Sequence, residues 1–273
     1  MPELPEVETI CRGLTKTIRS CKIVSAKKYR ENIRSLIPAN ICELITGTMI
    51  NSVARKAKYI VIGLSNNYSL IFHLGMSGKI LIYPENYIIS KHDHFRINLS
   101  DNKTFIFNDA RRFGLIEICK SDEINTHKLF ASLGPEPLDT SFNENYLHKK
   151  LRGRKLPIKI ALMDARIVVG VGNIYASESL FRSKIHPENE SGNISMAKLQ
   201  KLCVSIKEVL SDAINSGGST LRDYVQSSGD VGSFQHKFDV YGKEGKACSH
   251  CESNIERIVQ GGRSTFFCPS CQS

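Results

Sequence analysis

Four cysteines near the end of the chain constrain its fold more than any other feature of the sequence. They follow the pattern Cys248-x2-Cys251-x16-Cys268-x2-Cys271. Each Cys-x-x-Cys pair can direct two sulfurs at one ion, and two pairs complete a tetrahedral thiolate shell. A segment this short cannot bury a sufficient core, so bound metal would supply its folding energy. The pattern predicts one structural zinc ion, with a redox dithiol pair as the alternative interpretation.

The chain carries an excess of positive charge. Lys and Arg number 37 against 27 Asp and Glu, which gives a net charge of +10 and an isoelectric point near 9.1. This balance favours a polyanionic partner, either nucleic acid or an anionic membrane surface. The sequence contains no apolar run of about 18 residues, and its N-terminus is acidic where a signal peptide would be basic and then apolar. We therefore expect a cytoplasmic protein with about two domains.

Apolar periodicity divides the chain into a β-rich first half and a helical second half. Helical spacing covers residues 6–20, and strand-like runs follow it. These runs are 59–64, 68–74, 79–83, 95–99, 104–107 and 115–118. Polar pairs at 66–67 and 101–102 predict hairpin turns, and a Gly/Pro segment at 133–138 predicts a domain boundary. A long helix is predicted after Ser195, ending before Gly217.

Three later segments could contact an anion. The residues 260–263, Gln-Gly-Gly-Arg, predict a hairpin tip with an exposed arginine, and 170–173 should provide free backbone N–H groups at a helix start. The segment 148–159 contains six Lys and Arg and no acidic residue. Each segment also has an ordinary interpretation: a solvated turn, a helix cap and a solvated charged face.

The N-terminus could hold a nucleophile. Removal of Met1 would leave Pro2 with a secondary amine beside Glu3 and Glu6. Free α-amino groups titrate near roughly 7.7 to 8.0, and a helix N-terminus depresses that value, so part of the amine is unprotonated at neutral pH. Such an amine can attack a carbon while Glu3 acts as general acid or proton shuttle. Many chains begin Met-Pro without any catalytic role, so these residues alone leave the question open.

Five stretches, in order along the chain, resemble formamidopyrimidine-DNA glycosylase, the bacterial base-excision repair family for oxidised purines. They are 1–9, 73–78, 111–114, 170–178 and the four-cysteine segment. The resemblance implies an α+β multidomain fold with an N-terminal antiparallel β-sandwich and N-terminal helix, a helix-two-turn-helix domain and a C-terminal zinc β-hairpin. The boundaries expected from it are 1–132 for the catalytic sandwich, 133–150 for a linker, 151–236 for the helix-two-turn-helix domain and 237–273 for the zinc hairpin.

The resemblance also implies the activity, a bifunctional DNA glycosylase and AP lyase that excises 8-oxoguanine and formamidopyrimidines. Pro2 would form an iminium with C1′ of the damaged nucleotide, followed by β- and δ-elimination. Glu3 would assist sugar opening and proton transfer, and Lys58 would match the family's lysine in the catalytic site. Arg263 would also donate a proton in the elimination. The expected zinc ligands are the four cysteines.

The expected DNA contacts follow from the same resemblance. They are His92, Arg111, Asn173, Arg263, Met76 and Phe113. Met76 and Phe113 would be a wedge that fills the gap left by the flipped nucleotide, and Arg111 would probe the orphaned base. Asn173 and Arg263 would hold phosphates. His73 and His94 are expected to make phosphate or structural contacts and not to bind zinc.

Two features depart from this pattern or extend it. Ala110 stands where the family commonly has proline, which loosens the loop before the probe arginine. The residues 216–222 resemble the family's lid over the damaged base. The expected partner is damaged double-stranded DNA, with no membrane, for a monomer bound to the nucleoid in a bacterial cytoplasm. The alternatives are an endonuclease VIII-like pyrimidine glycosylase and a non-catalytic zinc-ribbon DNA-binding protein.

Overall fold

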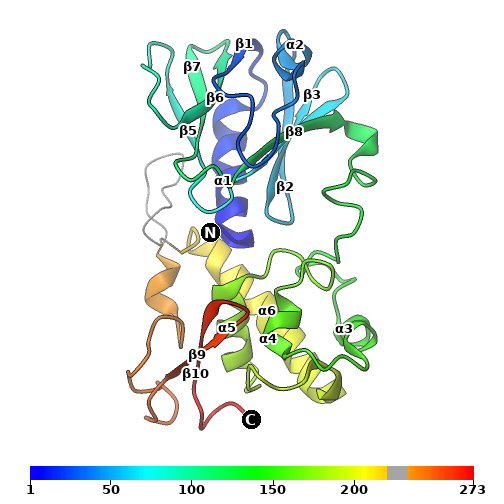
Figure 1. Ribbon diagram of the computed structural model, residues 1–273, viewed down its shortest axis with the longest axis vertical. Coiled ribbons are helices and arrows are strands. Elements are labelled where there is room, and N and C mark those ends of the chain that lie inside the picture. The colour runs from blue at the N-terminus through cyan, green and yellow to red at the C-terminus, as the bar shows by residue number, and fades with distance from the viewer. Residues whose placement is uncertain (220–232) are drawn as a thin grey trace. The chain divides into compact units, whose positions relative to one another are not determined.

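The computed structural model describes residues 1–219 and 233–273, which fold as two compact units (Figure 1). The first unit comprises Met1–Ala131 and the described part of Gly217–Ser233, and the second comprises Ser132–Ser216 and Phe234–Ser273. Contacts thus join Gly217 to Ser219 with the N-terminal unit, whereas the expected domain boundaries at 132, 150 and 236 remain a prediction. No helix in the described residues is long and apolar enough to cross a membrane.

The first unit contains two four-stranded antiparallel sheets with the orders β1-β6-β7-β5 and β2-β3-β4-β8. The strands are β1 Ile23–Lys28, β2 Ile50–Lys56, β3 Tyr59–Leu64, β4 Tyr68–His73, β5 Lys79–Pro84, β6 Asp93–Leu99, β7 Lys103–Asn108 and β8 Leu115–Lys120. Phe72 of β4 contacts Phe105 and Phe107 of β7, with ring centroids 5.3 and 5.7 Å apart. These aromatic contacts join the two sheets across a shared apolar core, which confirms the predicted sandwich.

The predicted hairpin turns are present, but two strands went unpredicted. Asn67 and Asn102 adopt the left-handed conformation, with φ of 63° and 59°, at the turns between β3 and β4 and between β6 and β7. Asparagine tolerates this conformation better than most residues. The strands β1 and β2 each bury only their first residue fully. They lie at the edges of their sheets, where the sequence lacks clean alternation.

Helix α1, Leu4–Ile18, begins two residues before the predicted start. Glu3 is its N-cap, and Glu3 and Glu6 form a reciprocal capping box, with proline in the first turn. The helix packs against β2 and β3 and buries its apolar stripe. A short helix α2, Ile41–Ile45, follows β1. The capping box therefore fixes the start of α1 and, with it, the first residues of the chain.

The second unit holds helices α3 Glu144–Leu151, α4 Ile158–Leu162, α5 Asn173–Arg182 and α6 Met196–Asn215, and a two-stranded antiparallel sheet of β9 Glu256–Gln260 and β10 Arg263–Phe267. The Ser195 side chain caps α6 by accepting a hydrogen bond from the Lys198 N–H, as predicted. The helix ends before Gly217, which has φ of 74°. Helix α3 begins inside the stretch 133–150 that was expected to be a linker and ends one residue beyond it. Short 3-10 turns occupy Ser121–Glu123 in the first unit and Ser191–Asn193 and Phe234–Lys237 in the second.

Candidate catalytic, nucleic-acid and metal sites

Two buried carboxyl groups, Glu3 and Glu6, lie close to Pro2 at the start of α1. Glu3 and Glu6 are each 3% exposed, whereas Pro2 is only partly buried. Glu6 Oε2 accepts a hydrogen bond from the Glu3 N–H at 2.8 Å, and Glu6 Oε1 accepts bonds from the Ser219 N–H and hydroxyl at 2.8 and 2.9 Å. Both oxygens of Glu6 are thus engaged in holding neighbouring backbone. Glu3 also contributes a side-chain oxygen to the capping box, so both carboxyl groups are fixed directly after Pro2.

Two residues of the predicted lid, Gly218 and Ser219, lie against Glu6. Gly218 has φ of +81°, and a Cβ built on it would lie 3.2 Å from Glu6 Oε1. The close approach to Glu6 and the left-handed backbone together require glycine here. The remaining residues of the predicted lid, 220–222, lie outside the described residues.

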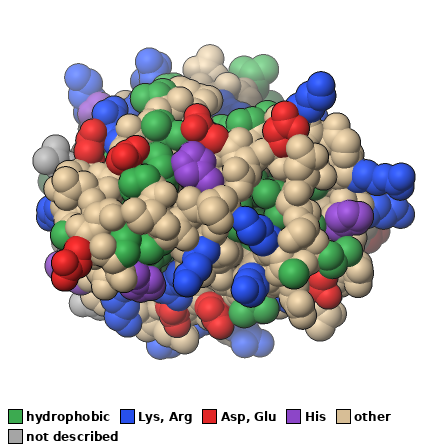
Figure 2. Space-filling view, turned by 90° about the horizontal axis from the view of Figure 1, so that it is seen from below, with side chains coloured by type: hydrophobic (Ala, Val, Ile, Leu, Met, Phe, Trp, Pro, Cys, Tyr) green, Lys and Arg blue, Asp and Glu red, His purple; other side chains and the backbone are tan. Residues whose placement is uncertain are grey.

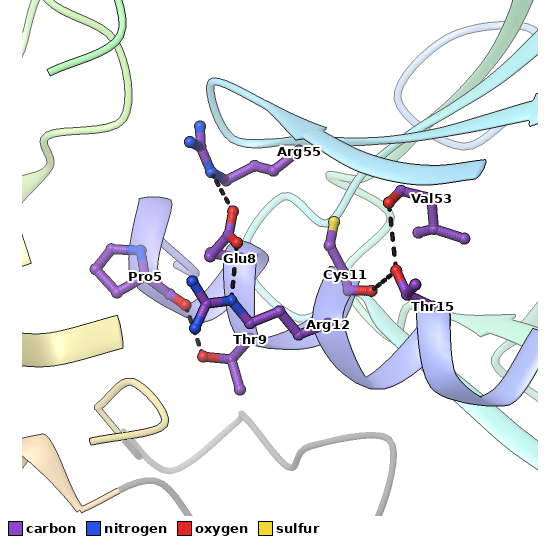
Figure 3. A network of polar contacts seen from close by, with 8 residues as sticks. All are labelled: Pro5, Glu8, Thr9, Cys11, Arg12, Thr15, Val53 and Arg55. Carbon is purple, nitrogen blue, oxygen red and sulfur yellow. Dashed lines mark hydrogen bonds and ion pairs between the residues drawn. The ribbon is translucent and has the colours of Figure 1, made fainter. Parts of the chain in front are cut away.

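Arg55 links α1 to the turn that carries Lys58 (Figure 3). Its Nε donates to Glu8 Oε2 at 3.0 Å, and its guanidinium also donates to the Ala57 carbonyl at 3.1 Å. The Arg12 side chain donates to the other Glu8 oxygen at 2.9 Å. The bond to Ala57 holds the residue directly before Lys58, so the turn between β2 and β3 is fixed relative to the start of the helix.

His73, at the end of β4, is a partly buried, neutral imidazole. Its Nδ1 accepts a hydrogen bond from the Gly75 N–H at 3.0 Å, and its ring contacts Tyr59. Burial, together with the positive charges of Arg34 and Lys58, lowers the pKa of His73 to about 4. The ring is therefore uncharged at neutral pH, with its proton on Nε2. An uncharged ring of this kind can donate one hydrogen bond without repelling the neighbouring cations.

A cavity of about 210 Å³ brings several predicted site residues together in the first unit. It is lined by Met1, Arg34, His73, Gly75, Met76 and Phe113. Met76 and Phe113 are 38% and 47% exposed, and the Arg111 guanidinium carbon lies 5.0 Å from the centre of the Phe113 ring. The side chains predicted as wedge and probe therefore form one exposed group near the N-terminus.

The other two histidines of these stretches differ in their surroundings. His94 is 1% exposed, and its Nε2 is 2.7 Å from the Asp109 carbonyl, so it serves a structural contact. His92 is partly exposed, and its carbonyl accepts a hydrogen bond from the Asp109 N–H at 2.9 Å. The DNA contact expected of the His92 side chain remains a prediction.

Asn173, the first residue of α5, is held from three sides in the second unit. Its amide donates to the Ser264 carbonyl at 2.9 Å and to the Tyr241 hydroxyl at 3.2 Å. Its oxygen accepts a bond from Lys159 Nζ at 2.6 Å. These contacts fix the side chain at a helix N-terminus, a position that favours anions.

Lys159 is a functional candidate that sequence reasoning missed, because it was counted only as one member of a charged segment. It is fully buried, and besides Asn173 its Nζ donates to Thr265 Oγ1 at 2.5 Å and approaches the Ser264 carbonyl at 3.3 Å. A buried cation is costly and needs such partners. Its apolar neighbours, Ile158 and Ile160, were the available sequence signal, because a lysine inside an apolar run is unusual.

A second buried ionisable group, Glu178 of α5, holds the segment that precedes the cysteines. Its carboxylate accepts hydrogen bonds from the backbone N–H groups of Asp239, Val240 and Tyr241 at 2.7, 3.0 and 2.8 Å. Burial raises the pKa of Glu178, and these three donors oppose that change. The carboxylate thereby fixes the backbone from which Tyr241 reaches Asn173.

Arg263 lies at the tip of the β9–β10 hairpin, as predicted. Gly261 and Gly262 have φ of 56° and 73°, the conformation that a two-residue turn between right-twisted strands requires. The hairpin tip packs near Ile160 of α4. Arg263 is exposed, and its neighbour Ser264 accepts the bond from Asn173. The two predicted phosphate-binding residues are therefore joined by one hydrogen-bond network.

The four predicted zinc ligands converge. Their sulfurs lie within 4.8 Å of one another, with 3.9 Å between Cys248 and Cys271 and 3.4 Å between Cys251 and Cys268. Zn–S bonds of about 2.3 Å in a tetrahedron require sulfurs about 3.8 Å apart. The donor set fits zinc in distance and chemistry. Cys248 and Cys268 also pack against Phe181, so the metal centre is attached to α5.

Basic side chains do not form one continuous patch on the face seen in Figure 2, where Lys and Arg are interspersed with Asp and Glu. In the segment 148–159, Lys149, Lys150, Arg152 and Arg154 are exposed, whereas Lys159 is fully buried. The segment is thus a solvated charged face with one internal exception.

Comparison with known proteins identifies three matching family models. The formamidopyrimidine-DNA glycosylase N-terminal domain matches residues 1–116, its H2TH domain matches 133–225, and the zinc finger found in FPG and IleRS matches 245–273. The formamidopyrimidine-DNA glycosylases of Zymomonas mobilis and Dinoroseobacter shibae are 47% and 45% identical, each over the full length of both chains. The chain belongs to the formamidopyrimidine-DNA glycosylase family.

Solved structures of this glycosylase family agree with the fold. Lactococcus lactis FPG in complex with a Fapy-dG containing DNA is 36% identical, with a TM-score of 0.91, over 99% of this chain and 100% of that chain. The same enzyme with an abasic site containing DNA also gives a TM-score of 0.91, at 36% identity over 99% of each chain. The predicted resemblance and fold class are confirmed, and the zinc finger match together with the converging cysteines confirms one structural zinc site.

Proposed function

We propose that this glycosylase-family chain is a bifunctional DNA glycosylase and AP lyase that removes oxidised purines from damaged double-stranded DNA. The observation that carries the proposal is the position of Pro2 beside buried Glu3 at the start of α1. The partner is DNA because solved relatives at 36% identity hold Fapy-dG or abasic-site DNA. The chain acts as a monomer on nucleoid DNA in a bacterial cytoplasm.

In this proposal the chemistry begins with a flipped nucleotide, since the glycosidic bond of a stacked base is inaccessible. Met76 and Phe113 fill the gap, and Arg111 contacts the orphaned base. The exposed apolar surface of the two wedge residues supports this role, because stacking worth about 1 to 3 kcal/mol per base offsets part of the extrusion. Because the free energies of stacking and of extrusion nearly balance, small differences between damaged and normal bases decide which base is excised.

Pro2 then attacks C1′ with its nitrogen lone pair, and the bond from C1′ to the base breaks with its electrons leaving on the base. Glu3 transfers protons between the opening sugar and the departing base. The resulting iminium acidifies the C2′ proton, and loss of that proton expels the 3′ phosphate. Loss of the C4′ proton from the conjugated iminium then expels the 5′ phosphate. Lys58 assists at the site, and Arg263 donates a proton in the elimination.

Asn173 and Arg263 hold phosphates of the bound DNA. The network through Ser264 and the buried Lys159 supports this assignment, because the two residues share contacts at a helix N-terminus. Bound zinc supplies folding energy to the hairpin that carries Arg263, and its four thiolates leave no position for substrate. His92 is proposed as a further DNA contact.

The first test uses duplexes with one lesion each. We expect strand cleavage at 8-oxoguanine opposite cytosine to be faster than cleavage at thymine glycol, measured under single-turnover conditions. Faster cleavage at thymine glycol would favour an endonuclease VIII-like enzyme. Binding without cleavage of either duplex would favour the non-catalytic alternative.

A second test concerns the buried cation. Lys159→Met is expected to weaken binding to an abasic-site duplex by about tenfold, because hydrogen bonds to charged groups are worth about 1.5 to 3 kcal/mol and the side chain orients Asn173. Its log affinity should also depend less on log salt, by about 0.9 for each phosphate that the variant no longer neutralises.

The matched control is Lys207→Met, which removes a partly exposed lysine that donates to the Asp139 carbonyl at 3.1 Å in the same unit. Its affinity and salt dependence should equal those of the unmodified chain. Equal losses in both variants would contradict the role assigned to Lys159.

A further inference from the structure

The wedge and probe side chains come from two separate loops of the first unit. Met76 lies in the turn between β4 and β5, whereas Arg111 and Phe113 lie in the loop between β7 and β8. Both loops end in solvent-exposed side chains that would enter DNA together. The placement of the two loops relative to each other therefore decides whether the three side chains can act as one unit.

A buried carboxylate joins them. Asp109 is fully buried at the end of β7, and its Oδ1 accepts a hydrogen bond from the Ser77 hydroxyl at 2.5 Å and from the Arg111 N–H at 3.3 Å. Its Oδ2 accepts a bond from the Gly114 N–H at 2.7 Å. The Ser77 hydroxyl oxygen in turn accepts the Arg111 N–H at 3.0 Å. Ser77 belongs to one loop and the other donors to the second.

The backbone of Asp109 is itself fixed by His94 of β6 and by His92, the residue directly before this strand. Its N–H donates to the His92 carbonyl at 2.9 Å, and its carbonyl oxygen lies 2.7 Å from His94 Nε2. The carboxylate therefore has little freedom to follow the loops if they move. The position of Asp109 therefore determines the positions of the two loops.

The loops also meet directly and under strain. A Cβ on Gly75 would lie 2.4 Å from the Phe113 carbonyl group, so only glycine allows this approach. Arg112, between the probe and wedge residues, has φ of 58°, a conformation that costs a residue with a Cβ about 1 to 2 kcal/mol. Exposed Ala110 does not restrict its own φ as proline would. The strained loop thus depends on contacts with its neighbours.

We propose that Asp109, acting through Ser77, is a positioning residue that presents Met76, Arg111 and Phe113 to DNA as one preorganised unit. The proposal rests on the proposed function, because it assumes that these side chains enter the duplex. Preorganisation matters most where a paired base must be extruded, since the wedge then competes with stacking and pairing. It matters less where no partner base has to be displaced or probed.

The test uses Ser77→Ala, which removes the link between the loops but leaves the Asp109 carboxylate. We expect base excision from 8-oxoguanine opposite cytosine to slow by about tenfold, as removal of one charge-assisted hydrogen bond implies. Strand cleavage at a preformed abasic site that faces a second abasic site should stay within about twofold, because no base needs displacing. Asp109→Asn should show the same selectivity with a larger loss, and Ser77→Thr should restore excision because it keeps the hydroxyl.

The matched control is Ser69→Ala, which removes a buried hydroxyl whose oxygen lies 2.9 Å from Ser121 Oγ in the same unit. Fluorescence of 2-aminopurine opposite the lesion reports insertion of the wedge, and should change more slowly in Ser77→Ala than in the control. Equal losses on both substrates, or a loss no greater than in Ser69→Ala, would overturn the positioning role. An unmodified chain that cleaves no lesion would instead overturn the proposed function.

Discussion

A chain that retains Met1 is expected to form no borohydride-stable adduct with damaged DNA, whereas the chain that begins at Pro2 forms one. With Met1 attached, the Pro2 nitrogen is a peptide nitrogen whose lone pair is delocalised and cannot attack C1′. The nearest amine is then displaced by up to about 3.6 Å along the chain. Met1 also lines the cavity with Met76 and Phe113, so its side chain adds bulk beside the wedge. Both effects reduce the formation of the adduct.

The experiment compares protein made with methionine aminopeptidase active or inhibited, and intact mass confirms the state of the terminus. Incubation with an 8-oxoguanine duplex and borohydride should add the mass of the DNA strand only to the processed chain. Binding to an uncleavable abasic analogue serves as the control, because Asn173 and Arg263 do not depend on the terminus and should keep affinity within a few-fold. Adduct formation by the Met1 chain would contradict the assignment of Pro2.

Loss of zinc is expected to have the second largest effect. Cys268→Ser replaces a fully buried sulfur that packs against Phe181, and zinc binding in comparable peptides supplies roughly 10 to 16 kcal/mol of folding free energy. Unfolding of β9 and β10 would remove Arg263 and also the Ser264 and Thr265 oxygens that hold Lys159. We therefore expect DNA affinity to fall by more than about 100-fold, since several phosphate and positioning contacts disappear together.

The matched control is Cys42→Ser, a half-buried cysteine of α2 in the other unit. It should keep one zinc per chain by elemental analysis and bind an abasic-site duplex normally. Added chelator should reproduce the Cys268→Ser loss in the unmodified chain, and added zinc should reverse it. Normal affinity in zinc-free protein would show that the hairpin folds without metal.

Local patterns predicted those parts of the molecule that local physics determines. The turn asparagines, the cap at Ser195 and the spacing of the cysteines each act within a few residues, so sequence sufficed to find them. The edge strands β1 and β2 were missed because neither shows clean alternation. Pairing makes them strands: β1 pairs with the distant β6, and β2 pairs with β3 across the turn at Ala57 and Lys58.

The same division holds for the candidate site. Asn173 and Arg111 were predicted from motifs, but the buried groups that contact them, Lys159 and Asp109, were not. Lys159 reaches Thr265 across more than 100 residues of chain, and Asp109 is bonded to Ser77 over a separation of 32 residues. No short window contains such pairs. Burial of a charged residue in an apolar run was the only local sign, and for Asp109 even that sign was absent.

The two-glycine turn between β9 and β10 limits how this protein can diverge. Side chains alternate along β10, so inserting or deleting one residue there would exchange the inward and outward positions from Arg263 to Phe267. A substitution at the turn changes one position at a time. A change of length moves Arg263 and the buried Thr265 together. During evolution the residues around the tip can therefore change, whereas the length of the turn between β9 and β10 is constrained.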